Sequence, residues 1–372
     1  MNIGATIRKV RRSREMTQED LAEFLNVSVS AVSQWESEKT TPDISMIPAI
    51  CSLLNISSDE LLGIDLNKKK EKIEEISKEA NSYSSRGYHQ EARDILQKGL
   101  KEFPDSYELL RSLMYVASFQ QGDHQYSKEE REEFLEEAIK LGHRILDGCT
   151  DDSFRHGAIQ ILCFSYADKG DIDKAVELAH KMSDISCSSD VLLSIVQKGT
   201  KGYRSNQSLM FNLFQSLENN MVTMNIRLDS GELAYTQEEM ATLRDKQIAL
   251  FHLMFENNDF GFFHTHICDT HKNQATYYAK TGNHEKTLEH LRKASEHAIE
   301  FIRCGGKTEH TSLVFRGFGK DTSFSTNNTD NDVAQLYNAM KSEAFNFIRT
   351  DLEFKRIEDN LREYAGKWSI KQ

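Results

Sequence analysis

Three stretches of the chain align on a glycine, and this repeated pattern constrains the fold more than any other feature. A tyrosine stands four residues before each glycine, in the pairs Tyr83–Gly87, Tyr166–Gly170 and Tyr278–Gly282. The aligned positions that flank these pairs are mostly small or aliphatic: Ala80, Ala92 and Leu96; Cys163, Ala175 and Ala179; Ala275, Thr287 and Leu291. Small residues let two antiparallel helices approach closely, and glycine makes the turn between them. The pattern therefore predicts helical hairpins.

The rest of the chain is also predicted to be helical. Its 372 residues contain only three prolines, and Glu, Lys, Leu and Ala are abundant. The stretch at about 73–106 matches the ~34-residue spacing of a tetratricopeptide repeat, and the other two stretches match it more loosely. Helical patterns such as "YELLRSLMYVASF", "REEFLEEAIKLGHRIL" and "SLMFNLFQSL" fill the gaps near 107–148 and 188–260. We predict an all-α chain that contains a tetratricopeptide-like superhelix; unrelated helical hairpins are the alternative.

The first 64 residues form a pattern of their own, with five short helices. The first covers about 3–14, and Thr17 caps the second, with Asp20 reaching back to it. Asn26 makes the tight turn, because Asn tolerates a left-handed backbone, and Ser28 caps the third helix. Two more helices are expected at 44–54 and 57–62, with Pro48 in a first turn capped by Ser45.

The third helix has an unusual surface. If Val32 and Trp35 anchor it to a core, the residues that point outward are Val29, Ser30, Ser33 and Gln34. Glutamine can bond adenine edges, serine can bond several bases, and valine can touch a thymine methyl group. Gln18, at the start of the second helix, is placed to contact a phosphate, because helix N-termini attract anions. The first 14 residues add five basic side chains and no acid, although the whole chain carries a net charge of −12.

This segment resembles the Cro/repressor-type helix-turn-helix, the XRE family. The resemblance is carried by "TQEDLA" at 17–22, "NVSVSAVSQWE" at 26–36, "TPD" at 41–43 and "LLNISSDELLG" at 53–63; Asn26 and Glu38 stand where the family usually has glycine. It implies that the third helix reads bases and that Gln18 and Lys39 contact the DNA backbone. The predicted DNA-binding residues are Arg11, Thr17, Gln18, Ser28, Val29, Ser30, Ser33, Gln34 and Lys39. A module that has lost DNA binding is the alternative.

We expect a helix-turn-helix domain at 1–66 and a repeat domain at 67–372. A charged helix at 67–80 leads into the first repeat, a Gly/Ser/Thr/Asn-rich loop covers 304–332, and a closing helix at 333–365 either caps the array or pairs with a second subunit. This combination resembles the peptide-responsive quorum-sensing regulators of Gram-positive bacteria. The resemblance implies a homodimer whose array binds a short signalling peptide. The candidate residues for binding the backbone of this peptide are Asn212, Asn219 and Asn273.

Other chemistry is not expected. In "HTHICDTH", His264, Cys268 and His271 share one helical face, but His271 aligns with the packing positions Ile76 and Ile159, so packing is favoured over a metal. His284, His290 and His297 are expected on helix surfaces. No phosphate-binding loop, nucleophile elbow or paired-carboxylate motif is present, so we predict neither an enzyme nor a cofactor.

The six cysteines are scattered and no apolar run is long enough for a membrane span, so the chain is expected to be cytoplasmic with no membrane partner. We therefore predict a sequence-specific transcriptional regulator that binds a double-stranded DNA operator and senses a peptide or protein in its repeat groove. A protein-interaction adaptor that uses its head only as a tether is the alternative.

Overall fold

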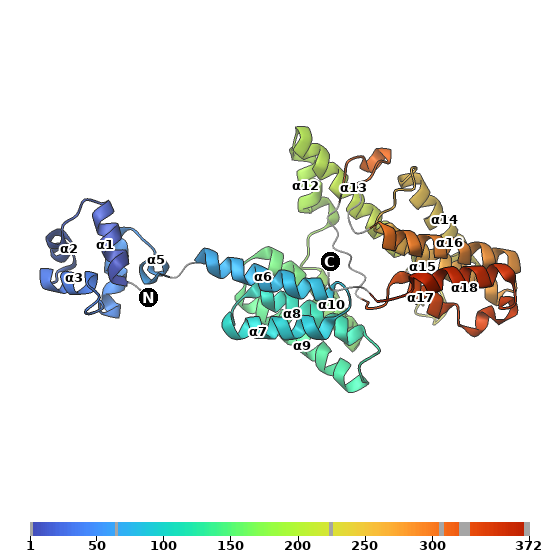
Figure 1. The fold of residues 1–372 in the computed structure, drawn as a ribbon, viewed down its shortest axis with the longest axis horizontal. Coiled ribbons are helices and arrows are strands. Elements are labelled where there is room, and N and C mark those ends of the chain that lie inside the picture. Colours follow the sequence, from blue (N-terminus) through green and yellow to red (C-terminus); the bar gives the residue numbers. More distant parts are fainter. Residues whose placement is uncertain (1–2, 64–65, 223–225, 305–308, 320–327, 368–372) are drawn as a thin grey trace. The chain divides into compact units, whose positions relative to one another are not determined.

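The computed structural model describes residues 3–63, 66–222, 226–304, 309–319 and 328–367. The chain divides into two compact units, Met1–Ser77 and Lys78–Gln372, which we call the head and the array. Apart from two isolated antiparallel bridges, the regular structure of these residues is helical (Figure 1). The all-α prediction is confirmed. Within the described ranges, no helix combines the length and apolar character that crossing a membrane requires.

The head contains the five predicted helices around a single core. They are α1 (Ile3–Ser13), α2 (Gln18–Leu25), α3 (Val29–Glu36), α4 (Ile47–Leu54) and α5 (Ser58–Leu62), with a 3₁₀ turn η1 (Ile44–Met46) before α4. The buried side chains at its centre are Ile7, Leu21, Leu25, Val32, Trp35, Ile50, Leu54 and Leu61. Helices α1 to α4 contribute residues at three- or four-residue spacing and α5 contributes Leu61, so the burial of these apolar side chains holds the head together.

The start of the fourth helix differs from the prediction. The backbone enters through η1, where the Asp43 carboxylate accepts hydrogen bonds from the backbone N–H and the hydroxyl of Ser45. Ser45 is therefore not the cap. Pro48 lies in the first turn of α4, as predicted, where its missing N–H has no intrahelical acceptor to lose.

Gly4 allows α1 to approach the end of α3. A Cβ atom at this position would lie 1.9 Å from the Trp35 carbonyl oxygen, which belongs to the backbone and cannot rotate away. Any side chain here would push α1 and α3 apart. The close approach fixes the base of α3 to the core of the head.

The array consists of successive helices joined mostly by short turns. They are α6 (Leu66–Ser84, which begins in the head), α7 (His89–Glu102), α8 (Tyr107–Gly122), α9 (Lys128–Gly148), α10 (Asp152–Lys169), α11 (Ile172–Ala179), η2 (Ile185–Cys187), α12 (Ser189–Val196), α13 (Gly199–Val222), α14 (Gln237–Met254), α15 (Phe263–Lys280), α16 (His284–Arg303), η3 (Leu313–Phe315), α17 (Asp332–Ala339), η4 (Glu343–Ile348) and α18 (Leu352–Tyr364). The predicted turns at Gly87, Gly170 and Gly282 are confirmed, with φ of 78°, 86° and 72°.

The three hairpins are not equally regular. In the first and third, the aligned small and aliphatic positions Ala80, Ala92, Leu96, Ala275, Thr287 and Leu291 are buried. In the second, α11 ends at Ala179, which is exposed, so this residue does not fill the position that Leu96 and Leu291 fill. The helical hairpins are confirmed, while their tetratricopeptide-like assignment stays a prediction.

The single closing helix predicted at 333–365 is wrong. The chain forms α17, η4 and α18 instead, with new starts at Ser342, whose hydroxyl accepts from Ala344 N–H, and at Asp351, whose carboxylate accepts from Glu353 N–H. Local caps compete with a continuous helix and interrupt it. The buried faces of these elements pack against α15 and α16, which corresponds to the capping alternative.

The segment 309–319 covers an aromatic core in the array. Phe211, Phe214, Phe251, Phe255, Phe260, Phe263 and Phe315 are buried together there. Asp259 anchors the segment: its carboxylate accepts hydrogen bonds from the backbone and side chains of Thr311 and Ser312. These bonds lower the pKa of Asp259, although burial alone would raise it. The covering segment is therefore held in place near its start, at Thr311 and Ser312.

Candidate nucleic-acid interface

The α2–turn–α3 segment is fixed by its own polar side chains. The Thr17 hydroxyl accepts from Asp20 N–H at 3.0 Å, and the Asp20 carboxylate accepts from Thr17 N–H at 2.7 Å. The bond from the Thr17 backbone, with that from its hydroxyl, lowers the pKa of Asp20. Asn26 ends α2 in the left-handed region at φ 55°, and the Ser28 hydroxyl accepts from Ala31 N–H at 3.1 Å. All four predicted roles are confirmed.

The third helix has the predicted orientation. Val32 is fully buried and Trp35 is 7% exposed, so both lie in the core of the head. Val29, Ser30, Ser33 and Gln34 are exposed. The Gln34 amide makes only a long hydrogen bond of 3.4 Å to the Ser30 hydroxyl, so most of its hydrogen-bonding capacity faces solvent. A short helix with such a surface can present donors and acceptors to base edges.

Arg11 lies inside the head. Its Nε and Nη2 atoms donate to the Glu36 carboxylate at 2.6 and 2.9 Å, and Nη1 donates to the Met16 carbonyl oxygen at 2.5 Å. Glu36 also accepts from the Gln18 amide at 2.8 Å. Burial alone would raise the pKa of Glu36, but the bonds from Arg11 and Gln18 outweigh burial and lower it. This network joins α1, α2 and α3.

The network determines which groups of Arg11 and Gln18 are available for contacts outside the head. Every guanidinium nitrogen of Arg11 is bonded within the head, so its predicted DNA contact gains no support from this arrangement and stays a prediction. The Gln18 amide donates one hydrogen bond to Glu36, and its predicted contact with a phosphate stays a prediction. Glu36 was missed, although it continues the inward stripe of α3 after Val32 and Trp35, just as Arg11 continues that of α1 four residues after Ile7.

The remaining predicted contacts lie at the surface. Thr17, Ser28 and Lys39 are exposed, and so are the basic residues Arg8, Lys9, Arg12 and Arg14. Lys39 follows Glu38, which has φ 62°, and Lys39 N–H donates to the Gln34 carbonyl oxygen at 3.0 Å. Glu38 thus occupies a left-handed position that favours glycine. The departures from the family pattern at Asn26 and Glu38 both fall at such positions.

Comparison with known proteins decides the family. A helix-turn-helix family model matches residues 7–61. The immunity repressor protein of Bacillus phage phi105 is 31% identical over 118 residues, which cover 31% of this chain and 81% of the repressor. The chain belongs to the XRE, or repressor-type, helix-turn-helix family. It is therefore a DNA-binding helix-turn-helix regulator.

Other similarities are narrower or looser. The HTH-type transcriptional activator BcrR of Enterococcus faecalis is 37% identical over 63 residues, which cover 17% of this XRE-family chain and 31% of BcrR. The crystal structure of Bacillus thuringiensis PlcR in complex with the peptide PapR7 and DNA is 15% identical, with a TM-score of 0.32, over 82% of this chain and 96% of PlcR. The curated relatives are regulators, which agrees with the expectation that this XRE-family protein is not an enzyme.

The asparagines predicted to bind a peptide lie on two helices of the array. Asn212 and Asn219 are on α13, and Asn273 is exposed on α15. Asn212 is half-buried, and its amide donates to the Asp190 carboxylate at 3.1 Å. Their role in ligand binding stays a prediction. The cavity at the N-terminal end of α13 is lined by a different asparagine, Asn206.

The histidine-rich segment of this regulator forms pairs inside the array. His264 Nδ1 lies 2.9 Å from His297 Nδ1, and His271 Nδ1 lies 2.8 Å from His290 Nδ1, between α15 and α16. Burial lowers the pKa of His264 to about 4 and that of His297 to about 3, so both are neutral at pH 7. The packing prediction for His271 is confirmed. The surface prediction is wrong for His290 and His297, which face α15 across the hairpin.

Proposed function

We propose that this regulator binds a palindromic operator as a homodimer and that its array senses a short peptide or a protein. The observation that carries the proposal is the orientation of α3, with Trp35 in the core and Gln34 in solvent. A helix fixed in this way can enter the major groove without unfolding any part of the head. Its exposed residues are small or neutral, so they fit between the two phosphate backbones.

The proposed contacts follow from the chemistry of each side chain. Gln34 bonds an adenine edge, Ser30 and Ser33 bond bases of either kind, and Val29 contacts a thymine methyl group. Thr17, Gln18, Ser28 and Lys39 contact phosphates, where hydroxyl groups, backbone N–H groups and a cation are favourable. Arg11 acts through Glu36 and Gln18, because it orients the amide of Gln18 at the N-terminus of α2.

Dimerisation and ligand sensing are proposed for the array. Two heads reading one palindrome must be held about one helical turn of DNA apart or a multiple of it, which a dimer can set. A ligand that binds one arrangement of the array more tightly than another then shifts the population of dimers that fit the operator. We propose the domain limits 1–66 and 67–372 for these two roles and a tetratricopeptide-like superhelix for the second.

A charge placed on α3 tests the proposal. In the full-length protein, Ser33→Glu should weaken operator binding about tenfold or more, since a carboxylate replaces a base contact and faces the DNA. The matched control is Ser52→Glu, which adds the same charge at an exposed serine of α4. Fragments selected from genomic DNA supply the operator, and mobility shifts supply the affinities. Equal affinities of the two variants would contradict base reading by α3.

The adaptor alternative predicts a different outcome. If the head serves only as a tether, no genomic fragment is selected above random DNA, and binding follows salt concentration alone. Mass spectrometry of molecules that co-purify with the full-length protein then identifies a protein partner instead of a peptide. These two measurements separate the two functions without assuming either.

A further inference from the structure

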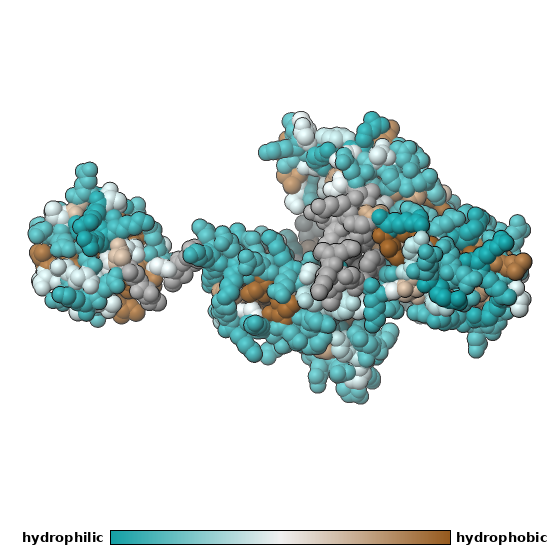
Figure 2. Space-filling model, in the orientation of Figure 1, coloured by the Kyte–Doolittle hydropathy of each residue, from teal (hydrophilic) through white to brown (hydrophobic). Residues whose placement is uncertain are grey.

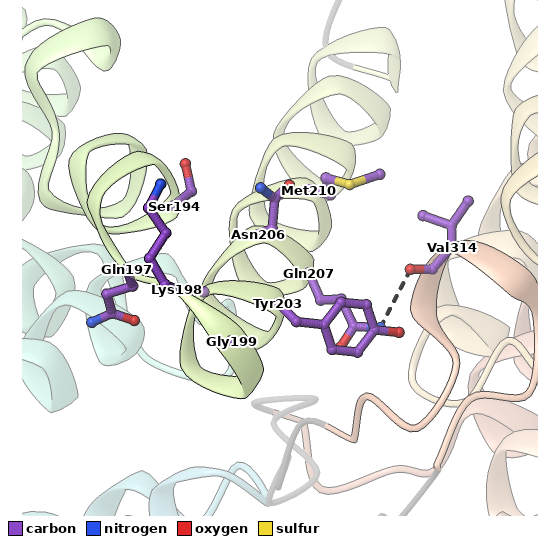
Figure 3. A pocket seen from close by; sticks show the side chains of 10 residues that line it. Ser194, Gln197, Lys198, Gly199, Tyr203, Asn206, Gln207, Met210 and Val314 are labelled. Carbon is purple, nitrogen blue, oxygen red and sulfur yellow. Dashed lines mark hydrogen bonds between the residues drawn. The ribbon is translucent and has the colours of Figure 1, made fainter.

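One cavity in the array is lined by both apolar and polar side chains. It has a volume of about 370 Å³ and lies where α12, the first turns of α13 and η3 meet. Figure 3 shows Lys198 and Ser194 beside α12, Asn206 and Met210 along α13, and Tyr203 and Gln207 turned toward the loop of η3. All residues that line the cavity belong to the array, whereas α3 belongs to the head.

The walls of this α12–α13 cavity are fixed. A Cβ at Gly202 would lie 2.4 Å from the Gln197 carbonyl oxygen, so glycine lets α13 start tightly against the turn after α12. The Ser205 hydroxyl donates to the Gln197 side chain at 2.7 Å. On the opposite side, the buried Gln207 amide donates to the carbonyl oxygens of Val314 and Arg316. Since 309–319 is also anchored by Asp259, the cavity exists before any ligand binds.

The elements that form the cavity expose many aliphatic side chains, of which Met210 lines the cavity itself. No residue of α12 is buried. The exposed fractions of Leu192, Leu193, Ile195 and Val196 on α12 are 50, 41, 62 and 64%; those of Met210, Leu213 and Leu217 on α13 are 37, 43 and 52%; that of Leu313 is 65%. Figure 2 shows brown hydrophobic patches over α12 and over the loop of η3 on a mostly teal face. So many exposed aliphatic side chains on the elements that form one cavity indicate an apolar binding partner.

The α12–α13 side of the cavity has a charge opposite to that of the whole chain, while on the η3 side the Glu256 carboxylate accepts from Leu313 N–H. Between Val191 and Leu217 the sequence contains Lys198, Lys201 and Arg204 and no acidic residue, although the whole chain has a net charge of −12. The acid that precedes this stretch, Asp190, already accepts a hydrogen bond from Asn212. Arg204 is bonded to Gln207. Lys198 lines the cavity, is exposed, and donates only a long hydrogen bond of 3.4 Å to the Ile195 carbonyl oxygen in the described residues; Lys201, three residues further along the chain, is also exposed. Carboxylates are therefore attracted to this edge of the array.

We infer that the α12–α13 cavity binds a short peptide with apolar side chains and a carboxylate, held by Lys198 and Lys201; this rests on the proposal that the array senses a peptide. The apolar side chains of the peptide cover the exposed face of α12 and the side of α13 that carries Met210. The Asn206 amide, which has no hydrogen bond to another side chain in the described ranges, offers a donor and an acceptor to the peptide backbone. The carboxylate lies at the lysine edge.

Defined peptide pools test this inference. The first pool contains short random peptides made from Leu, Ile, Phe and Asp with a free C-terminus. The second pool replaces Asp by Asn and amidates the C-terminus, and two further pools make one change each. Full-length protein is immobilised, and retained peptides are quantified by mass spectrometry. We expect retention of the first pool to exceed that of the second about tenfold, and the intermediate pools to identify which carboxylate matters.

Charge reversal supplies the matched variants. Lys198→Glu with Lys201→Glu should reduce retention of the first pool about tenfold, whereas Lys140→Glu with Lys246→Glu, which reverses two exposed lysines of α9 and α14, should leave it unchanged. Hydrogen exchange should slow in α12 and α13 when the first pool is added. Circular dichroism checks that both variants are folded.

Three outcomes would overturn the inference: equal retention of the charged and amidated pools, no effect of the Lys198 and Lys201 reversals, or protection of α12 that rises with protein concentration alone, which would assign this face to a second copy of the chain. Mobility shifts on the same samples keep the two proposals apart. DNA binding without peptide retention contradicts peptide binding in the cavity and leaves the proposed operator binding by α3 unaffected. Peptide retention that leaves DNA affinity unchanged supports peptide binding in the cavity and contradicts the proposal that the ligand controls operator binding.

Discussion

The helices α3 and α12 have the same length of eight residues and similar starts, yet they present opposite surfaces. In each, a serine hydroxyl accepts from a backbone N–H three residues on, at 3.1 Å for Ser28 and 3.4 Å for Ser188. The head buries Val32, Trp35 and Glu36 of α3 and leaves short polar side chains outside. The array buries no residue of α12 and leaves aliphatic side chains outside. The first surface suits hydrogen-bonding bases, and the second suits an apolar ligand.

The two units also bury polar groups differently. The head buries charge, in the Arg11–Glu36 ion pair. The array also buries two carboxyl groups, those of Glu218 and Asp332, but it differs from the head in its histidines, which are neutral at pH 7 and form pairs between α15 and α16. A paired carboxylate stabilises the folded state at pH values above its ordinary pKa. A buried neutral histidine stops contributing to stability once the pH is low enough for the unfolded chain to take up a proton on that histidine. The units should therefore differ in what destabilises them.

The largest expected loss of stability comes from removing the side chain that anchors α3 in the core of the head. Trp35→Ala should lower the free energy of unfolding of the head by about 3–5 kcal/mol, because a large buried side chain is removed. The matched change in the array, Leu192→Ala on exposed α12, should cost about 0.5 kcal/mol or less. Hydrogen exchange of the full-length protein reports the two helices separately. Similar losses at both sites would mean that α12 is covered in solution.

Acid should affect the array before the head. Unfolded histidine titrates near 6.5, above the folded pKa of about 4 for His264 and about 3 for His297, so the stability they contribute is complete above pH 6.5 and is lost as pH falls toward these folded values. At pH 5 each should cost about 2 kcal/mol relative to pH 7. The pKa of Glu36 is lowered, so its contribution in the head is complete above about pH 4.3 and is lost below it.

Hydrogen exchange between pH 7 and pH 5, corrected for the intrinsic exchange rates, measures this difference. Protection should decrease in α15 and α16 and stay constant in α1 to α3. The control is His297→Phe, which removes one titrating group and should make the response of α16 flatter. A head that loses protection first would contradict the comparison.

Gln34→Ala should separate recognition from stability. It should weaken binding to a selected operator by about 1–3 kcal/mol and relax base choice at one position, because a bidentate contact is lost. The stability of the head should change by about 0.5 kcal/mol or less, since the side chain is exposed. Affinities against a series of single-base operator variants provide the measurement. An unchanged base preference would show that Gln34 is not a reader.

The smallest expected effect concerns Glu38. Glu38→Gly should stabilise the head by about 0.5–1 kcal/mol, as relief of the left-handed backbone is partly offset by the greater freedom of glycine in the unfolded chain. It also removes a carboxylate beside Lys39, so DNA affinity should rise slightly at low salt. Urea unfolding and mobility shifts at two salt concentrations measure the two effects. Glu38→Gln, which removes the charge and keeps the backbone strain, is the control.

Local sequence signals determined most of the head and the frame of the array. The capping box at Thr17 and Asp20, the left-handed turn at Asn26 and the glycine turns at 87, 170 and 282 each involve residues within a few positions of one another. Such signals act through backbone geometry and helical periodicity, which the sequence displays directly. Helical periodicity also determined which residues of α3 face solvent, once Val32 and Trp35 were assigned to the core.

Only the tertiary structure decided how distant residues meet. Arg11 and Glu36 are 25 positions apart, and although each continues the inward stripe of its helix, only the packing of α1 against α3 shows that the two side chains meet. The partition of 333–365 into three pieces, the His264–His297 pair and the α12–α13 cavity likewise depend on which surfaces pack together. Periodicity specifies which face of a helix is apolar, but the partner that covers this face is set by the packing of the whole unit, as the uncovered α12 illustrates.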